Sequence, residues 1–193
     1  MHAALLKHIN GFLLKPMSPT EEKAITDRFV PRAYRKRQFL LQAGDPCVKN
    51  SFVVEGCFRA YVVDTDGKEH NLQFAVENGW TLDMGSLYKE EPSEMNIEAL
   101  ENSSVLQIDR KAFYELYDHF PVFDRYFRIL AENAYIAVQK RLVRSHSFTA
   151  EARYLDFIAR YPHLLNRISD AKIASFLGMT PEFLSKLRRN LNN

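Results

Sequence analysis

The sequence is short of cysteine, clustered glycine and long apolar runs, and each shortage excludes a class of protein. Two cysteines, Cys47 and Cys57, are too few for a disulfide framework or for an iron–sulfur cluster. The seven glycines are scattered, so no glycine-rich phosphate loop is present. No apolar run reaches the roughly 18 residues of a membrane span. The N-terminus lacks the apolar stretch of a secretory signal, so we expect a cytoplasmic protein with no membrane contact.

Histidine is also scarce where metal chemistry would need it. His70 is the single histidine of the central segment, whereas a metal enzyme of the cupin type needs several clustered histidines and a glutamate. The sequence has no nucleophile motif either. We therefore expect no enzyme, no metal and no cofactor, and a cupin-like enzyme remains only as an alternative.

The composition is that of a folded protein with an uneven charge. Of the 193 residues, 46% are apolar and 26% are charged, which suits one large domain or a medium and a small one. From Gln139 to Asn193, ten Lys or Arg stand against four Asp or Glu, while the rest of the chain is net acidic. A basic C-terminal segment on an acidic body suits contact with a polyanion, although chance clustering would give the same count.

Period-two patterning occupies the middle of the chain, from about Phe29 to Ile108. Short alternating stretches lie at residues 51–54, 57–63, 71–75, 97–100 and 105–108. The run Asp64-Thr65-Asp66-Gly67 is typical of a turn between two of them. Many short strands with regular turns predict an antiparallel roll or barrel. Helices flank this segment, because Leu5, Leu6 and Ile9 form one apolar face, and Ser18-Pro19-Thr20-Glu21 is a capping box followed by a helix.

The chain after Asp109 is predicted to be helical. Asp109 caps a helix to about Tyr117, and Pro121 starts a long helix that reaches about Ser145. Its positions Phe123, Phe127, Leu130, Ala134 and Ala137 have coiled-coil spacing, and a second apolar surface contains Ile129, Ile136, Val138 and Leu142. One surface can pack on the roll, and the other needs a partner. A second copy of the chain is the simplest partner, although both surfaces could be buried within one chain.

The stretch from Ser169 to Leu191 has the pattern of a helix-turn-helix. Ile173, Ala174 and Leu177 give the first helix an apolar face, and Gly178 can end it in a left-handed conformation. Thr180 is a cap and Pro181 a first-turn residue for the second helix, whose Leu184 and Leu187 return to the shared core. The pattern predicts DNA binding, and an ordinary helical hairpin is the alternative.

The second helix of such a unit places its N-terminal part in the major groove. Pro181, Glu182, Ser185 and Lys186 are then expected to face outward. Lys186 can donate to guanine, and Glu182 can accept from cytosine. Arg188, Arg189 and Thr180 are better placed for phosphates.

The order of roll, long helix and helix-turn-helix resembles the Crp/Fnr family of the cyclic-AMP receptor protein over nearly the whole chain. The matching segments are Gly44-Asp45, Phe52-Val53-Val54-Glu55-Gly56, Asp66-Gly67-Lys68-Glu69, Ala99 and the C-terminal unit. The resemblance implies an α+β fold with a cyclic-nucleotide-binding-type jelly roll, a homodimer through the long helix, and a palindromic DNA operator. It also allows RNA polymerase as a partner.

Two departures from the family pattern stand out. The family's Phe-Gly-Glu-like turn reads Asp83-Met84-Gly85-Ser86 here, and its phosphate-binding Arg is replaced by Ser93. Glu90, Glu91 and Glu94 lie nearby and would repel a phosphate. Gly85, Ser86 and Ser93 either line an effector pocket or belong to an empty, vestigial site, and cyclic AMP bound in the usual mode is disfavoured. Only two residues follow Leu191, so we expect no C-terminal wing.

These observations predict three regions. Residues 1–117 form the roll with its flanking helices, residues 118–147 the long dimerisation helix, and residues 148–193 the DNA-binding domain. The predicted function is that of a bacterial transcription regulator. The alternative is a signalling module that binds a cyclic nucleotide or another small metabolite and has little contact with DNA, against which Lys186, Arg188 and Arg189 argue.

Overall fold

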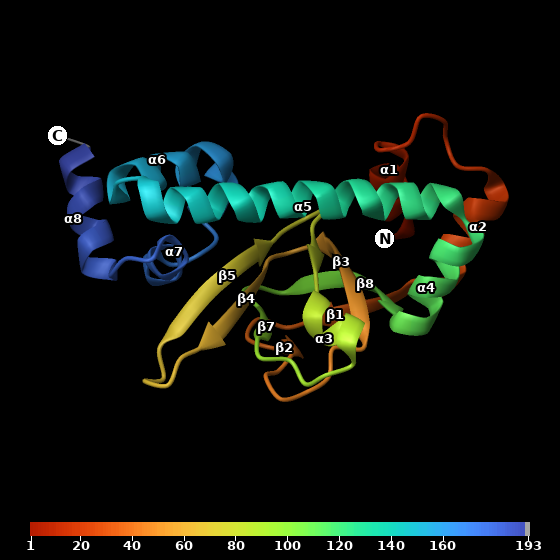
Figure 1. Ribbon diagram of the computed structural model, residues 1–193, viewed down its shortest axis with the longest axis horizontal. Coiled ribbons are helices and arrows are strands. Elements are labelled where there is room, and N and C mark those ends of the chain that lie inside the picture. The colour runs from red at the N-terminus through yellow and green to blue at the C-terminus, as the bar shows by residue number, and fades with distance from the viewer. Residues whose placement is uncertain (192–193) are drawn as a thin grey trace. The chain divides into compact units, whose positions relative to one another are not determined.

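The computed structural model describes residues 1–191, in which two β-sheets are flanked by helices (Figure 1). The first half contains α1 (His2–Asn10), α2 (Pro19–Arg28), β1 (Val30–Tyr34), β2 (Phe39–Leu41), β3 (Lys49–Glu55), β4 (Phe58–Val63), β5 (Glu69–Ala75), β6 (Trp80–Thr81) and α3 (Met84–Lys89). The second half contains β7 (Asn96–Ala99), β8 (Ser103–Asp109), α4 (Arg110–His119), α5 (Pro121–Ser147), α6 (Ala150–Arg160), the 3₁₀ turn η1 (Pro162–Leu164), α7 (Asp170–Leu177) and α8 (Pro181–Leu191).

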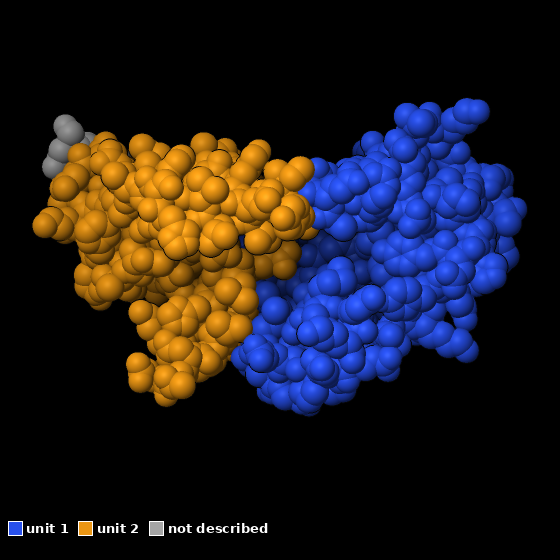
Figure 2. Space-filling model, viewed as in Figure 1, with its two compact units in different colours: residues 1–60, 74–133 blue, residues 61–73, 134–193 orange. Residues whose placement is uncertain are grey.

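The chain divides into two compact units, shown in different colours in Figure 2. The first contains residues 1–60 and 74–133, and the second contains residues 61–73 and 134–193. The outer half of the β4–β5 hairpin is therefore part of the same unit as α6, α7 and α8. The three predicted regions are a different division of the chain and stay a prediction.

The sheets confirm the predicted roll. One has the strand order β1-β8-β3-β6 and the other β2-β7-β4-β5. The resolved pairings β1–β8, β2–β7, β3–β6 and β3–β8 are all antiparallel. Gly67 closes the predicted turn with a φ of +79°, a conformation that glycine adopts without steric cost. The roll, the long helix and the C-terminal helices together confirm the predicted fold class.

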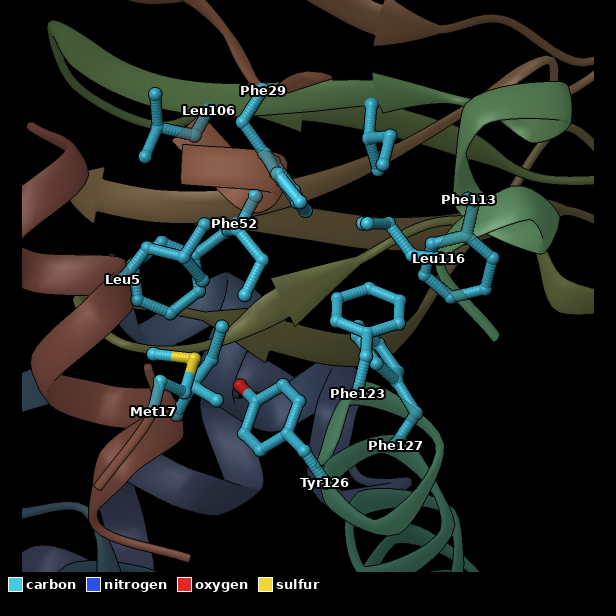
Figure 3. Packing of buried hydrophobic residues seen from close by; sticks show 14 residues of the cluster. Leu5, Met17, Phe29, Phe52, Leu106, Phe113, Leu116, Phe123, Tyr126 and Phe127 are labelled. Atoms are coloured by element: carbon cyan, nitrogen blue, oxygen red, sulfur yellow. The ribbon is translucent and has the colours of Figure 1, made fainter. Parts of the chain in front are cut away.

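Apolar residues of the first unit form two clusters. The inward-facing residues Val53, Phe58, Ile97 and Val105 belong to the cluster between the strands. The other joins α1, α2 and α4 to the start of α5 and is rich in aromatic rings (Figure 3). In this second cluster the Tyr126 hydroxyl accepts a hydrogen bond from the Trp80 indole N–H at 2.8 Å. A buried tyrosine needs such a partner, because an unpaired hydroxyl in an apolar core is costly.

Local capping signals define the starts of three helices, of which those of α2 and α4 were predicted. Ser18 and Glu21 form the capping box of α2, and Asp109 accepts the backbone N–H of Ala112 at the start of α4. Thr149 caps α6 in the same way. The sequence did not indicate β1, β2, β6 or α3. β1 has a proline and no alternating apolar side, since four of its five residues are exposed, and β2 and β6 are too short to show a period.

Helix α5 is buried at its start and exposed further on. Phe123, Tyr126 and Phe127 pack in the aromatic cluster, so the first part of the predicted coiled-coil stripe is used within the first unit. Ala134 and Ala137 of that stripe are exposed. The large exposed side chains of the helix are those of the second apolar surface and their neighbours: Tyr135, Ile136, Val138, Leu142 and Val143. The exposed apolar side chains of the helix thus belong mainly to the second surface, of which Ile129 is half-buried.

Among residues 1–191, no helix is both long and apolar enough to span a bilayer. The predicted absence of a wing concerns the chain after Leu191, which lies outside the described residues.

Candidate nucleic-acid interface and effector cassette

The turn between α7 and α8 has the geometry that the sequence predicted. Gly178 ends α7 with a φ of +67°, and the N–H of Met179 bonds to the carbonyl of Ala174 at 2.9 Å. This is the return bond of a left-handed helix end. The Thr180 hydroxyl then accepts the N–H of Phe183 at 3.2 Å, which satisfies a free donor in the first turn of α8.

The two helices share an apolar interior. Ile173 and Ala174 of α7 are fully buried, and so is Leu184 of α8, while Leu187 is nearly so. Tyr154 and Phe157 of α6 are buried in the same unit. Because Leu184 and Leu187 face inward, the opposite side of α8 faces solvent.

The structure brings most of the predicted DNA-contacting residues onto this exposed side. Thr180, Pro181, Glu182, Ser185, Lys186 and Arg189 are all exposed. Lys186 also lines a groove of about 350 Å³ between the start of α6 and α8. Glu182 is the one acidic residue of α8, against Lys186, Arg188 and Arg189. A solvent-facing helix side with exposed basic side chains at Lys186 and Arg189 suits contact with DNA.

Arg188 differs from the others. Its Nε donates to the Tyr154 hydroxyl at 2.8 Å, and its terminal nitrogen pairs with the Asp170 carboxylate at 2.5 Å. These contacts connect α8 to α6 and to the first residue of α7. The predicted phosphate contact of Arg188 therefore requires this ion pair to open.

Phe183 is a residue of this surface that the sequence analysis did not single out. Its side chain is 48% exposed in the first turn of α8 and lines the same groove as Lys186. A large apolar side chain in the first turn of the predicted second helix was the available signal, because phenylalanine can contact the methyl group of thymine.

The predicted effector residues surround a carboxylate that the sequence analysis had not assigned to the site. Asp83 is 8% exposed. It accepts the backbone N–H of Ser86 at 3.1 Å and the hydroxyl of Ser93 at 2.7 Å. Gly85 lies exposed in the first turn of α3, next to this pair. The structure thus brings Gly85, Ser86 and Ser93 together, with Asp83 among them. These four residues are called the effector cassette below.

The polar groups of this cassette are already bonded within the protein. The Ser86 hydroxyl donates to the carbonyl of Glu91 at 2.5 Å and accepts the N–H of Cys47 at 2.8 Å. The Ser93 hydroxyl also contacts the backbone of Met95. Cys47 is buried, and burial raises the pKa of its thiol, as expected for a packing residue.

These residues differ from the phosphate-binding site that the family resemblance implies. That site needs donors and a cation for the phosphate, whereas here the Ser93 hydroxyl points to a carboxylate. The charge of Asp83 would repel an anion placed at the same donors. Arg110, the first basic residue after this segment, is paired with Glu90 at 2.8 Å.

The described residues contain no group of three or more His, Cys, Asp or Glu side chains that could hold a metal ion. A buried ion pair joins Arg59 of β4 to Glu98 of β7 at 2.6 Å. Both partners are nearly inaccessible, which identifies the pair as part of the sheet's packing.

Comparisons with known proteins agree with this architecture. Residues 31–120 match the family of cyclic nucleotide-binding domains. FixK2 of Bradyrhizobium japonicum superposes with a TM-score of 0.72 and 20% identity, over 85% of this chain and 84% of that one. CLP, a c-di-GMP-responsive global regulator of Xanthomonas campestris, superposes with a TM-score of 0.72 and 15% identity, over 91% of this chain and 92% of that one.

A Crp/Fnr-family regulator from Eubacterium rectale gives a TM-score of 0.70 and 17% identity, over 91% of this chain and 84% of that chain. A search of proteins of curated function found no match. The predicted resemblance is confirmed at the level of the fold: the chain has the fold of the Crp/Fnr regulators, and its residues 31–120 match the family of cyclic nucleotide-binding domains.

Proposed function

Because this chain joins a cyclic nucleotide-binding domain to the remaining elements of the Crp/Fnr fold, we propose that it is a transcription regulator that binds palindromic DNA as a homodimer. The observation that carries the proposal is the exposed polar and basic side of α8, opposite the buried Leu184 and Leu187. A regulator of this kind acts in the cytoplasm, where RNA polymerase is a further partner. We propose no catalytic activity, in line with the regulators that share the fold.

Within this proposal, the residues of α8 have two roles. Those at the helix start, Pro181, Glu182, Ser185 and Lys186, face the base edges. Thr180, Arg188 and Arg189 face the phosphates, with Arg188 bound to Asp170 in the free protein. Base contacts set sequence preference, and phosphate contacts set affinity for all sequences.

The second half of α5 supplies the proposed dimer interface. Val138 is 64% exposed, and Leu142, one turn further along the same helix face, is 58% exposed. Apolar side chains along one helix face favour burial against another copy, since a two-fold axis places the same face on both partners. The pair of chains would then present two α8 helices to successive major grooves.

The roll is proposed to work without cyclic AMP in the usual mode. A neutral hydrogen bond from a serine contributes about 0.5–1.5 kcal/mol, against about 1.5–3 kcal/mol for a bond between charged groups. The difference alone weakens binding roughly tenfold. Asp83 adds a negative charge where the phosphate would lie, so any effector of this site is neutral or cationic.

Selection from random-sequence duplex DNA tests the DNA-binding proposal. We expect the purified protein to enrich an inverted repeat, because a symmetric dimer reads the same half-site twice. A variant with Glu182→Ala and Lys186→Ala should lose this enrichment while keeping its fold, since both side chains are exposed. Enrichment of no sequence, or of the same sequence by both proteins, would contradict the assignment of α8.

Titration calorimetry with cyclic AMP and with cyclic GMP tests the effector proposal. We expect no heat of binding at micromolar nucleotide. Micromolar binding that is lost on changing Gly85 to Val or Ser93 to Ala would show that the cassette accepts a phosphate despite Asp83.

A further inference from the structure

The edge of strand β5 is covered by the first helix of the helix-turn-helix. β5 is the last strand in its sheet, so one side of its backbone has no neighbouring strand. The Ser175 hydroxyl of α7 donates to the carbonyl of Glu69 at 2.8 Å and accepts the N–H of Asn71 at 3.0 Å. The Asn71 side chain, 2% exposed, donates to the carbonyl of Lys172 at 3.3 Å. One serine and one asparagine thus satisfy groups that an edge strand otherwise leaves open.

Arg141 of α5 lies at the same junction. Its guanidinium donates to the carbonyl of Asn71 at 3.1 Å, to that of Phe176 at 3.2 Å, and to that of Leu72. It also lies over the Phe176 ring, 4.2 Å from the ring centre. One side chain therefore joins three elements, because Asn71 and Leu72 belong to β5 and Phe176 to α7.

The chemistry of this contact requires arginine. In the part of the chain that the structure describes, the partners of Arg141 are backbone carbonyls and an aromatic face, with no carboxylate among them. A planar guanidinium has five donors and can serve several carbonyls while stacking on a ring, which an ammonium cannot do. Burial also lowers the pKa of Arg141, so the side chain gives up hydration to make these bonds.

The contact of Arg141 with Phe176 is linked to α8, the proposed recognition helix, through helix α7. Phe176 lies two residues before Gly178, where α7 ends. Arg188 of α8 pairs with Asp170 at the other end of α7. Helix α7 is therefore held to the hairpin near its C-terminus and to α8 at its N-terminus. A shift of α7 against β5 would carry α8 with it.

We propose that Arg141 is a positioning residue that fixes the orientation of α8 by fastening α7 to the β4–β5 hairpin. The proposal rests on the function proposed above, because a fixed α8 sets the distance between the two half-sites that a dimer reads. Ser175 and Asn71 support the same fastening. Arg141 itself touches no base or phosphate.

Amide hydrogen exchange on the whole protein tests the fastening without DNA. Arg141→Ala should speed amide exchange across α7, residues 170–177, while the amides of α6 stay protected. Arg141→Lys should give an intermediate change, and Ser175→Ala a smaller change in the same segment. Lys140→Ala is the matched control, because Lys140 is the adjacent cation on α5 and is exposed. If Arg141→Ala and Lys140→Ala exchange alike, the inference is overturned.

Operator spacing then separates positioning from simple loss of stability. The probes are the palindromic duplex selected with the wild type and two derivatives with the half-sites one base pair closer or further apart. Arg141→Ala should weaken binding to the selected duplex about tenfold. It should bind the altered duplexes with nearly the same affinity as the selected one, whereas wild type and Lys140→Ala should discriminate strongly.

The affinities for the three duplexes decide whether Arg141 positions α8 or only stabilises the fold. Equal weakening on all three duplexes would show that Arg141 stabilises the fold only, and would overturn the positioning role. If the wild type binds no duplex, the proposed function fails, and the spacing inference fails with it. The exchange result still decides whether Arg141 holds α7. If Arg141→Ala does not fold, Ser175→Ala provides the same comparison with a smaller perturbation.

Discussion

Lys186 and Arg189 occupy the exposed side of α8 but should have different effects on binding. Lys186→Ala should cost about 1–3 kcal/mol and relax the preference at one base pair in each half-site, because it removes a base contact. Arg189→Ala should weaken binding to all sequences and reduce the slope of log K against log salt by about one unit, because it removes a phosphate contact. Fluorescence anisotropy over a salt series measures both effects.

The two variants control for each other, since each removes one positive charge from the same helix. An unchanged base preference in Lys186→Ala would show that the register assigned to α8 is wrong.

Asp83 is expected to contribute to the stability of the fold. Asp83→Ala leaves the N–H of Ser86 and the hydroxyl of Ser93 without their acceptor, which should lower the free energy of unfolding by about 1–3 kcal/mol. Asp109→Ala is the matched control, because Asp109 caps α4 in the same way at an exposed position. Urea denaturation measures both, and a loss in Asp83→Ala no larger than in Asp109→Ala would contradict the role given to Asp83.

Single residues could be predicted where the constraint is local. Gly178 and Thr180 were assigned correctly because a left-handed helix end and a helix cap involve only a few neighbouring residues. The partners of Asp83, Arg141 and Arg188 could not be predicted, since each contacts residues between 10 and 70 positions away. Sequence periodicity shows which way a side chain faces, and it does not identify the residue on the other side.

At the scale of elements, the exposed face of α5 gives the clearest prediction. Val138→Glu places a charge on a side chain that is 64% exposed in the single chain and buried in the proposed dimer. We expect the variant to be a folded monomer that binds the palindrome weakly, because a buried unpaired charge opposes association. Sedimentation velocity measures the state of association.

Asn133→Glu is the control for this charge change, since it adds the same charge to the same helix at an exposed position, on the side away from Val138 and Leu142. A wild-type protein that remains monomeric at micromolar concentration, or a Val138→Glu variant that remains dimeric, would show that this face is not the interface.

Elements with a strong period or a clear cap were predictable, and short edge elements were not. The long helix was found from Pro121 and its apolar spacing, and the structure extends it to Ser147. The coiled-coil stripe that begins at Phe123 starts in the aromatic cluster, a placement that periodicity could not assign because it does not tell a core-facing side from a partner-facing one. Strand β1 and helix α3 lacked the apolar alternation or the length that a sequence pattern needs.

At the scale of the whole molecule, the chain joins an acidic N-terminal part to a basic C-terminal part. The charge of residues 139–193 is carried by side chains such as Lys186 and Arg189, which remain exposed, while Arg141 and Arg188 are used internally. Only part of the positive charge counted in the sequence is therefore free for DNA. The number of phosphate contacts, and with it the salt dependence of binding, should be smaller than the composition alone suggests.

Hydroxyl-radical footprinting on the selected duplex tests the central claim most directly, because it depends on both α8 and the dimer. The account predicts two protected segments related by two-fold symmetry, with centres about 34 Å or ten base pairs apart. Val138→Glu should abolish the paired pattern. A single protected segment, or uniform weak protection that does not depend on sequence, would contradict the account.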